Sequence, residues 1–239
     1  MTRLLGAIQL FLLLIAGLET AAQGGGSPKP IASGQSLPKV LVIGDSISIG
    51  LTPFLAERLK AVAEVRHHKG NAEHTGTGLK KLEDWLGGES WDVIQFNWGL
   101  WDLCYRHPLS KAQGRRDKVR GTLTTSLPRY AANLEGLVQR LQATGAYLIF
   151  ATTTVVPEGE AGRKRGDDLR YNEAALKVMN RHHLTVTDLN HVSRSFPDAF
   201  FVAPGNVHFT PEGYQALAKA AESNIREGLK SDSSKRPDQ

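Results

Sequence analysis

A serine directly after an apolar run is the first residue whose type and position suggest chemistry. Residues 39–50 read KVLVIGDSISIG, and the run Val40–Ile43 ends abruptly at Gly44, Asp45 and Ser46. A serine hydroxyl is a poor nucleophile until a neighbouring base takes its proton. Ser46 therefore needs a base from elsewhere in the sequence. Without one, Asp45 and Ser46 only form a turn or a helix cap.

The candidate base is His208, one of eight histidines. It lies in GNVHFTPEGY, directly before Thr210 and Pro211, a pair typical of a helix start. With His208 as base, Ser46 could attack an ester, form an acyl-enzyme and be released by water. The alternative is a histidine that lies at the surface or caps the helix.

The elements that must position this pair alternate between strand and helix. Strands are expected at 40–43, 91–96, 146–154 and 184–189, and helices around 52–62, 79–86, 130–141, 168–180 and from 210. The first of these helices is expected to begin at Thr52 and Pro53. Such alternation predicts a mainly parallel sheet with helices on both faces. Ligands bind at the carboxyl ends of such strands, where Ser46 lies.

Two sequence blocks resemble those of a known family. GDSIS near the start and VHFTPEGYQALA near the end are similar to the first and last blocks of the SGNH/GDSL hydrolase superfamily. This resemblance implies an α/β fold, a three-layer α/β/α sandwich with a mainly parallel, flavodoxin-like sheet. It also implies a carboxylic ester hydrolase with Ser46 as nucleophile and His208 as base. The backbone N–H of Ser46 would belong to the oxyanion hole.

The middle and last blocks depart from the family pattern. The second block usually has a glycine where this sequence has Ala72 or Glu73, and Gly76 is the nearest downstream glycine. The backbone N–H of any of the three is a candidate donor. In the third block Trp101 replaces an asparagine, and its indole N–H can still donate a hydrogen bond. Asn97 is the alternative oxyanion donor, or else it forms a hydrogen bond at the sheet end. In the last block Gly205 occupies the position, three residues before His208, where the family usually has an aspartate.

The missing aspartate leaves the orientation of the His208 ring open. Asn206, two residues before His208, is the candidate for holding the ring, with a backbone carbonyl as the alternative. Asp102, Asp188 and Asp198 would reach the ring only if the fold brought them there, and none of them is assigned.

The expected function is hydrolysis of O-acyl esters, with acetyl or short acyl groups on carbohydrate as candidate substrates. Two alternatives stay open: a non-catalytic member of the fold that binds glycans or a partner, and an acyltransferase that uses the same acyl-enzyme. We expect no cofactor, and no metal site, because the histidine pairs lack ligand spacing.

Charge does not point to nucleic acid. The net charge is +5, and the basic clusters GRR (114–116) and GRKR (162–165) fall in expected loops. We interpret them as solvated loop charge rather than a phosphate-binding patch, and expect no nucleic-acid partner.

The N-terminus has the pattern of a secretory signal peptide. Residues 1–22 are expected to be that peptide, 23–38 a flexible linker, 39–230 the hydrolase-like domain and 231–239 a disordered tail. The protein is then expected to be exported, periplasmic or extracellular, with no stable membrane span after cleavage. An uncleaved N-terminal anchor is the alternative. The single cysteine, Cys104, excludes an intramolecular disulfide.

Overall fold

A parallel sheet of five strands forms the centre of the molecule in the computed structural model, which describes residues 36–233. The strand order is β2-β1-β3-β6-β7 and every pairing is parallel. The strands are β1 (Lys39–Ile43), β2 (Glu64–His67), β3 (Val93–Phe96), β6 (Tyr147–Ala151) and β7 (Thr185–Thr187). This is the flavodoxin-like order, so the predicted fold class is confirmed. The edge strand β2 was not among the predicted strands.

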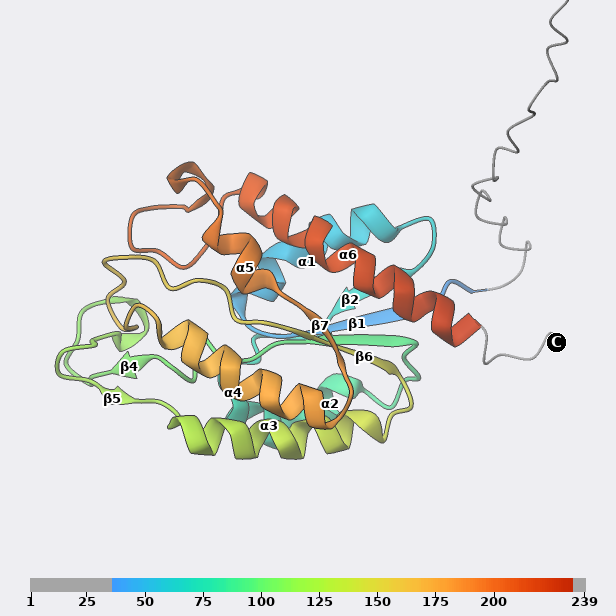
Figure 1. Cartoon of the computed structure of the whole chain (residues 1–239), viewed down its shortest axis with the longest axis horizontal. Coiled ribbons are helices and arrows are strands. Elements are labelled where there is room, and N and C mark those ends of the chain that lie inside the picture. Colours follow the sequence, from blue (N-terminus) through green and yellow to red (C-terminus); the bar gives the residue numbers. More distant parts are fainter. Residues whose placement is uncertain (1–35, 234–239) are drawn as a thin grey trace, which may run out of the picture. The chain divides into compact units, whose positions relative to one another are not determined.

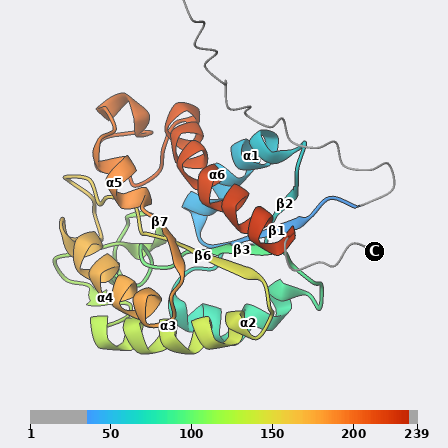
Figure 2. The same cartoon turned by 45° about the vertical axis from the view of Figure 1, so that its right-hand side comes forward.

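Helices cover both faces of the sheet, which completes the three layers. Figure 1 shows α1, α5 and α6 on one face and α2, α3 and α4 on the other, and the turned view of Figure 2 shows the same separation. Their bounds are α1 (Ser46–Leu59), α2 (Thr75–Leu86), α3 (Leu127–Gln142), α4 (Asp167–Arg181), α5 (Leu189–Arg194) and α6 (Pro211–Ser233).

The central strands are buried on both faces. All residues from Val40 to Ile43 in β1 and from Val93 to Phe96 in β3 are buried. Apolar strands of this kind, interrupted here only by the buried Gln95 in β3, are expected where helices cover both sides of a parallel sheet. Burial of each large apolar residue contributes about 1.5–3 kcal/mol, so these strands form a firm base for the residues that follow them.

Helix α1 begins six residues earlier than the sequence predicts. Asp45 is its N-cap, and its Oδ1 accepts a hydrogen bond of 2.9 Å from the N–H of Ile47. Pro53, the expected first-turn residue, lies inside the helix instead. The capping aspartate thus sets the helix start, and Ser46 becomes its first residue.

Close packing of α1 against α6 brings the two ends of the domain together. A Cβ on Gly50 would lie 2.2 Å from Cζ of Tyr214, so only glycine at this position lets the tyrosine ring rest on α1. The Tyr214 ring in turn meets Phe209 edge-on at 5.7 Å. This contact positions the start of α6, and with it the loop that carries His208, over the start of α1.

A two-stranded hairpin, unpredicted from the sequence, extends from the carboxyl side of the sheet. It pairs β4 (Tyr105–Arg106) with β5 (Thr122–Leu123), and Figure 1 shows it at the opposite end of the molecule from the last turn of α6. Two further differences concern the ends of the domain. Helix α6 continues to Ser233, so residues 231–233 of the expected tail are helical. The expected signal peptide and most of the expected linker lie outside the described residues.

No helix within residues 36–233 is both long and apolar enough to cross a membrane.

Candidate active site

Ser46 and His208 meet at the carboxyl edge of the sheet. The distance from Ser46 Oγ to His208 Nε2 is 2.8 Å, although 162 positions separate the two residues. Ser46 is the first residue of α1, so its N–H has no acceptor within the helix. His208 lies in the loop before α6, and both residues are partly accessible to solvent. The two groups chosen from the sequence are thus within hydrogen-bond reach.

The hydrogen bonds around His208 define which ring nitrogen carries the proton. The backbone N–H of His208 donates to Oδ1 of Asn206 at 2.9 Å, which identifies this amide atom as the acceptor. The same Oδ1 lies 2.9 Å from Nδ1 of the ring, so Nδ1 must donate to it. Nε2 is then the bare nitrogen, and the Ser46 hydroxyl donates to it. This is the arrangement in which the imidazole can take the serine proton.

Gly205, at the position of the usual aspartate, has no room for a side chain. Its φ is +69°, and a Cβ there would lie 2.9 Å from the carbonyl carbon and oxygen of Gly159. A carboxylate three residues before His208 is therefore excluded by backbone conformation and by the neighbouring loop. Asn206, one residue later, supplies the polar partner instead.

The surroundings of His208 favour its neutral form. Burial lowers the pKa of His208, and the positive charges of Arg163 and Arg116 lower it further. No carboxylate within the described residues accepts a hydrogen bond from the ring. The imidazole is thus unprotonated at neutral pH and available as a base.

Asp45, the acid in the Gly-Asp-Ser turn, has a structural role. Asp45 is buried, and its Oδ1 caps α1 while its Oδ2 has no partner. Burial raises the pKa of Asp45, and the N–H of Ile47 and the charge of Arg163 oppose this rise. Asp45 makes no hydrogen bond to Ser46 Oγ or to His208.

The other aspartates considered from the sequence also have partners elsewhere. Asp102 is fully buried and accepts hydrogen bonds from the N–H and the hydroxyl of Thr75 at the start of α2. Asp188 caps α5 and accepts a hydrogen bond from Thr152. Asp198 begins a short 3-10 turn. None of the three orients His208.

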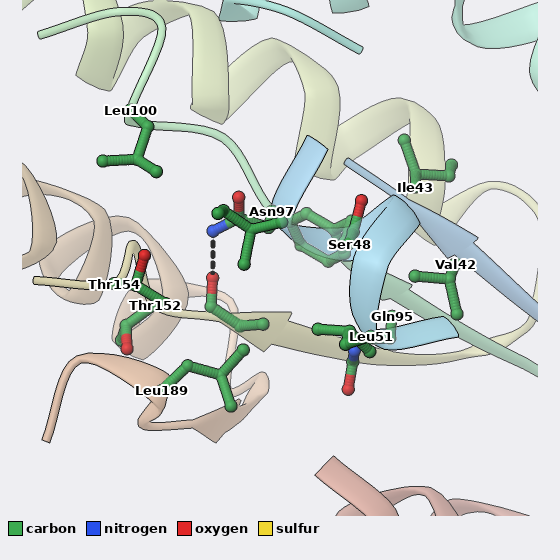
Figure 3. A pocket seen from close by; sticks show the side chains of 13 residues that line it. Val42, Ile43, Ser48, Leu51, Gln95, Asn97, Leu100, Thr152, Thr154 and Leu189 are labelled. Carbon is green, nitrogen blue, oxygen red and sulfur yellow. Dashed lines mark hydrogen bonds between the residues drawn. The ribbon is translucent and has the colours of Figure 1, made fainter. Parts of the chain in front are cut away.

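Asn97 follows β3 and lies close to the turn that carries Ser46. A Cβ on Gly44 would lie 3.5 Å from Cβ of Asn97. Nδ2 of Asn97 donates to the carbonyl of Ala151 at 2.7 Å, which leaves one amide hydrogen uncommitted. Figure 3 shows this bond beside a narrow apolar cavity between α1 and the strand ends, a cavity that neither Ser46 nor His208 lines.

Trp101 lies in the turn after β3, and its ring contacts an arginine. The guanidinium of Arg106 stands 4.3 Å from the centre of the indole. The indole N–H donates no hydrogen bond within the described residues. Trp101 therefore lies at the same edge of the sheet as Ser46 and His208 without a hydrogen bond to either of them.

The second block places a non-glycine residue in a left-handed conformation. Glu73 has φ of +52°, a region that glycine occupies at least strain. Its N–H donates to Oδ1 of Asn71 at 2.8 Å, and its carboxylate accepts from the hydroxyl of Thr77. Of the two positions aligned with the family glycine, Glu73 is therefore the one with the backbone conformation that a glycine would adopt.

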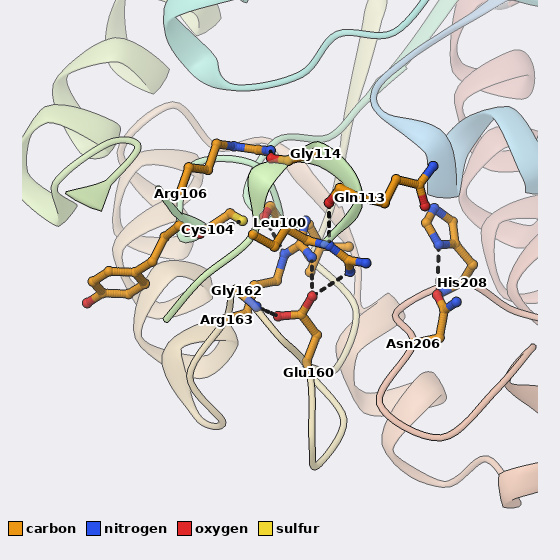
Figure 4. A network of polar contacts seen from close by, with 12 residues as sticks. Leu100, Cys104, Arg106, Gln113, Gly114, Glu160, Gly162, Arg163, Asn206 and His208 are labelled. Carbon is orange, nitrogen blue, oxygen red and sulfur yellow. Dashed lines mark hydrogen bonds and ion pairs between the residues drawn. The ribbon is translucent and has the colours of Figure 1, made fainter. Parts of the chain in front are cut away.

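A network of charged side chains beside His208 was not predicted from the sequence. Glu160 is fully buried, and its Oε1 lies 2.6 Å from Arg116 and 2.9 Å from Arg163. Figure 4 shows this network in one view with the hydrogen bond between Asn206 and His208. Arg116 and Arg163 belong to the two basic clusters that the sequence led us to interpret as solvated loop charge. That interpretation is wrong for these two side chains, which are largely buried and paired with Glu160.

A second serine–histidine contact lies nearby, between Ser48 and His67, and was also missed. The two side chains are 2.8 Å apart, and Ser48 Oγ also lies 2.7 Å from the carbonyl oxygen of Asp45. Burial lowers the pKa of His67 to about 4. Ser48 is buried, so it cannot meet a substrate and serves to fix the first turn of α1.

Comparison with known proteins places the protein in a family. The profile of the GDSL-like Lipase/Acylhydrolase family matches residues 42–216. No match was found among curated protein sequences.

Similar solved structures share the fold at low sequence identity. A lipase/acylhydrolase from Enterococcus faecalis has a TM-score of 0.66 and 20% identity, and the match covers 85% of this chain and 100% of that one. The acetyl xylan esterase AlAXEase has a TM-score of 0.63 and 19% identity, with coverage of 78% and 99%. A catalytic mutant of an acetylxylan esterase from Geobacillus stearothermophilus has a TM-score of 0.60 and 18% identity, with coverage of 84% and 96%.

Proposed function

Because the chain belongs to the GDSL-like Lipase/Acylhydrolase family, we propose that it hydrolyses carboxylic esters through an acyl-enzyme on Ser46. The observation that carries this proposal is the hydrogen-bonded series from Ser46 Oγ through His208 to Asn206. It supplies a nucleophile, a base and a group that holds the base in the required tautomer.

In the first step Ser46 Oγ attacks the ester carbonyl while His208 Nε2 takes the hydroxyl proton. The imidazolium then returns this proton to the leaving alcohol as the tetrahedral intermediate collapses to the acyl-enzyme. A water molecule attacks the acyl-enzyme with His208 again as base, and the acid and free Ser46 are released. Asn206 accepts from Nδ1–H throughout and positions the ring.

The developing oxyanion needs donors near Ser46. We assign the uncommitted N–H of Ser46 to this role, because it opens α1 and the helix dipole favours negative charge there. Asn97 and Trp101 are the two candidates for a side-chain donor. Loss of the true donor lowers kcat by about 10²–10³-fold, so kinetics of Asn97→Ala and Trp101→Phe distinguish them.

The proposed substrates are O-acyl esters with acetyl or short acyl groups on carbohydrate. Two of the similar structures are acetyl xylan esterases, which supports a short acyl group and a sugar alcohol. We also propose export, on the basis of the signal-peptide pattern in residues 1–22. Recovery of the protein from the cell interior, with residues 1–22 still attached, would contradict export.

The test is release of 4-nitrophenol from 4-nitrophenyl acetate by the purified domain. We expect Ser46→Ala to lower kcat by at least about a thousandfold, because it removes the nucleophile. Ser48→Ala is the matched control, since Ser48 is the other serine of the same turn and is buried. Activity that survives in Ser46→Ala, or an unreactive wild-type protein that also resists a fluorophosphonate probe, would refute the proposal.

A further inference from the structure

The positive charge of the protein is concentrated in the hairpin after β3. Residues 105–121 contain six basic side chains and one acidic side chain, so their net charge equals the +5 of the whole sequence. The remainder of the sequence is balanced. The net positive charge is therefore a property of this one segment and not of the sequence as a whole.

The hairpin is fastened to the loop between β6 and α4, which carries the second basic cluster. The N–H of Tyr105 donates to the carbonyl of Gly162 at 2.6 Å, and the N–H of Lys118 donates to that of Ala161 at 2.9 Å. A Cβ on Gly162 would lie 2.6 Å from Cβ of Arg116, so glycine is required for this close approach. Two clusters about fifty residues apart in sequence thus form one surface.

One carboxylate serves two guanidinium groups in this surface. Oε1 of Glu160 faces both Arg116 and Arg163, and Oε2 accepts the N–H of Gly162 at 2.7 Å. The side chains of Arg116 and Arg163 are only 21% and 5% exposed, so little water screens them. Both oxygens of Glu160 are occupied, and two guanidinium groups share this one carboxylate. A cluster of positive charge that is only partly compensated favours an anion beside it.

A third arginine forms no salt bridge among the described residues, although the charge of the Glu73 carboxylate acts on it. The backbone of Arg106 forms a β-bridge with that of Arg116, and its side chain donates to the carbonyl of Gly114 while it covers the Trp101 ring. The Nη2 groups of Arg106 and Arg116 donate no hydrogen bond within residues 36–233. Unused guanidinium donors held in fixed positions suit an oxyanion group.

This surface borders the proposed nucleophile and base. The loop of Glu160 and Arg163 touches the loop of His208 where Gly159 and Gly205 meet backbone to backbone. The charges of Arg163 and Arg116 also lower the pKa of His208, in agreement with that proximity.

We propose that Arg116 and Arg106 form a subsite for an anionic group of the substrate, so that the enzyme acts on esters bearing a carboxylate or a sulfate beside the scissile bond. This inference rests on the proposed ester hydrolysis for its catalytic part, while the binding site itself stands on the arginine cluster. Trp101, beneath Arg106, would form one wall of the subsite.

The kinetic test uses three O-acetylated methyl galactosides that differ only at carbon 6: hydroxymethyl, carboxylate and sulfate. We expect wild-type kcat/KM, measured by acetate release at low salt, to be about tenfold or more higher for the charged sugars, as hydrogen bonds to charged groups allow. The ratio between carboxylate and sulfate identifies which oxyanion the subsite prefers. Equal kcat/KM for all three sugars would overturn the proposal.

Substitution of the two arginines tests whether they cause the preference for charged sugars. Arg116→Gln should reduce the preference for charged sugars by about tenfold, and Arg106→Gln should also reduce it. Glu160 keeps Arg163 as a partner in Arg116→Gln, and Arg106→Gln leaves the whole ion-pair network in place if the first variant fails to fold. Arg165→Gln is the matched control, because Arg165 is 75% exposed in the same loop. A preference that survives both test variants, or falls equally in Arg165→Gln, would overturn the proposal.

A binding measurement separates this inference from the proposed activity. Calorimetry with the Ser46→Ala protein should detect binding of trigalacturonate. The dissociation constant for neutral galactotriose should be at least about tenfold larger. An inactive wild-type protein that still discriminates in this way would refute ester hydrolysis but retain the subsite. Equal binding of a single-stranded oligonucleotide and trigalacturonate would overturn the subsite, since it would identify a general polyanion surface.

Discussion

Oδ1 of Asn206 accepts two hydrogen bonds from His208, one from the backbone N–H and one from Nδ1, each 2.9 Å long. A single neutral amide thus positions the loop and the ring together. An aspartate would hold the ring equally well and would also stabilise the imidazolium by its charge. This protein has the orientation without the charge.

We expect the acidic limb of the pH profile to reflect this difference. His208 must be neutral to act as a base, and burial and the nearby arginines lower its pKa. Activity should therefore persist below the ordinary histidine value of 6.5 and decline only as pH falls through the lowered pKa. Asn206→Asp should raise the pKa of His208 and move this limb to higher pH. The measurement is kcat/KM for 4-nitrophenyl acetate between about pH 4 and 8.

Asn206→Ala is the control for the orienting part of this effect. It removes the acceptor without adding charge, so kcat should fall by about 10–100-fold. An acidic limb that stays in place in Asn206→Asp would contradict the assignment of Asn206 as the partner of the ring.

The meeting of Gly205 and Gly159 predicts a stability cost at position 205. Gly205→Ala combines a left-handed residue with a contact of 2.9 Å to the Gly159 backbone, and should destabilise the domain by about 1–3 kcal/mol. The displaced loop should lower kcat as well, because it carries His208. Urea unfolding and ester kinetics measure the two effects.

Gly145→Ala isolates the strain from the contact. Gly145 has φ of +76° and nothing within 4 Å of a Cβ. This variant should therefore lose about 1 kcal/mol of unfolding free energy, from the left-handed backbone alone, and should keep its full activity. Similar losses of stability and activity in the two variants would show that the contact with Gly159 is unimportant.

Gly50 predicts a coupling between helix packing and catalysis. In Gly50→Ala the new methyl would meet the Tyr214 ring at 2.2 Å, and overpacking of this kind costs about 1–3 kcal/mol. The ring contacts Phe209, the neighbour of His208, so kcat should fall together with stability. Thermal unfolding and ester kinetics of the same preparation provide the measurement.

Gly136→Ala is the matched helical control. A Cβ on Gly136 would make an ordinary contact of 3.5 Å with Leu79, so alanine should stabilise α3 by about 0.5–1 kcal/mol through its helix propensity. If Gly50→Ala were also stabilising, the close packing of Tyr214 on α1 would be disproved.

Asp102 predicts a pH dependence of stability. Burial raises the pKa of Asp102 from 3.8 to about 7. The folded state therefore retains a proton that the unfolded state loses between these two values, and stability attributable to Asp102 falls as pH rises through that interval. The unfolding free energy of the wild type should therefore fall by a few kcal/mol relative to that of Asp102→Asn, which cannot titrate at this position, as pH rises from about 4 to 7. Urea unfolding across that range is the measurement, and a constant difference would mean that the buried carboxyl is already ionised at low pH.

Individual elements show how far sequence patterns reach. The buried strands β1, β3 and β6 were predictable because a short, mainly apolar run between helical segments is typical of a strand covered on both faces. The edge strand β2 was not, since its residues are polar and partly exposed. The start of α1 was misplaced because Thr52 and Pro53 also fit a helix start, and only the hydrogen bond of Asp45 decides between the two.

The local sequence determined the fold class and the choice of Ser46, His208 and Asn206, because strand periodicity, turn residues and the family blocks are all properties of short segments. Only the tertiary structure decided that Asn206 accepts from the His208 ring, that Gly205 has no space for a carboxylate, and that two basic clusters meet beside the site. These depend on distances between segments far apart in the sequence, which arise from the packing of α6 on α1 and of the hairpin on its neighbouring loop.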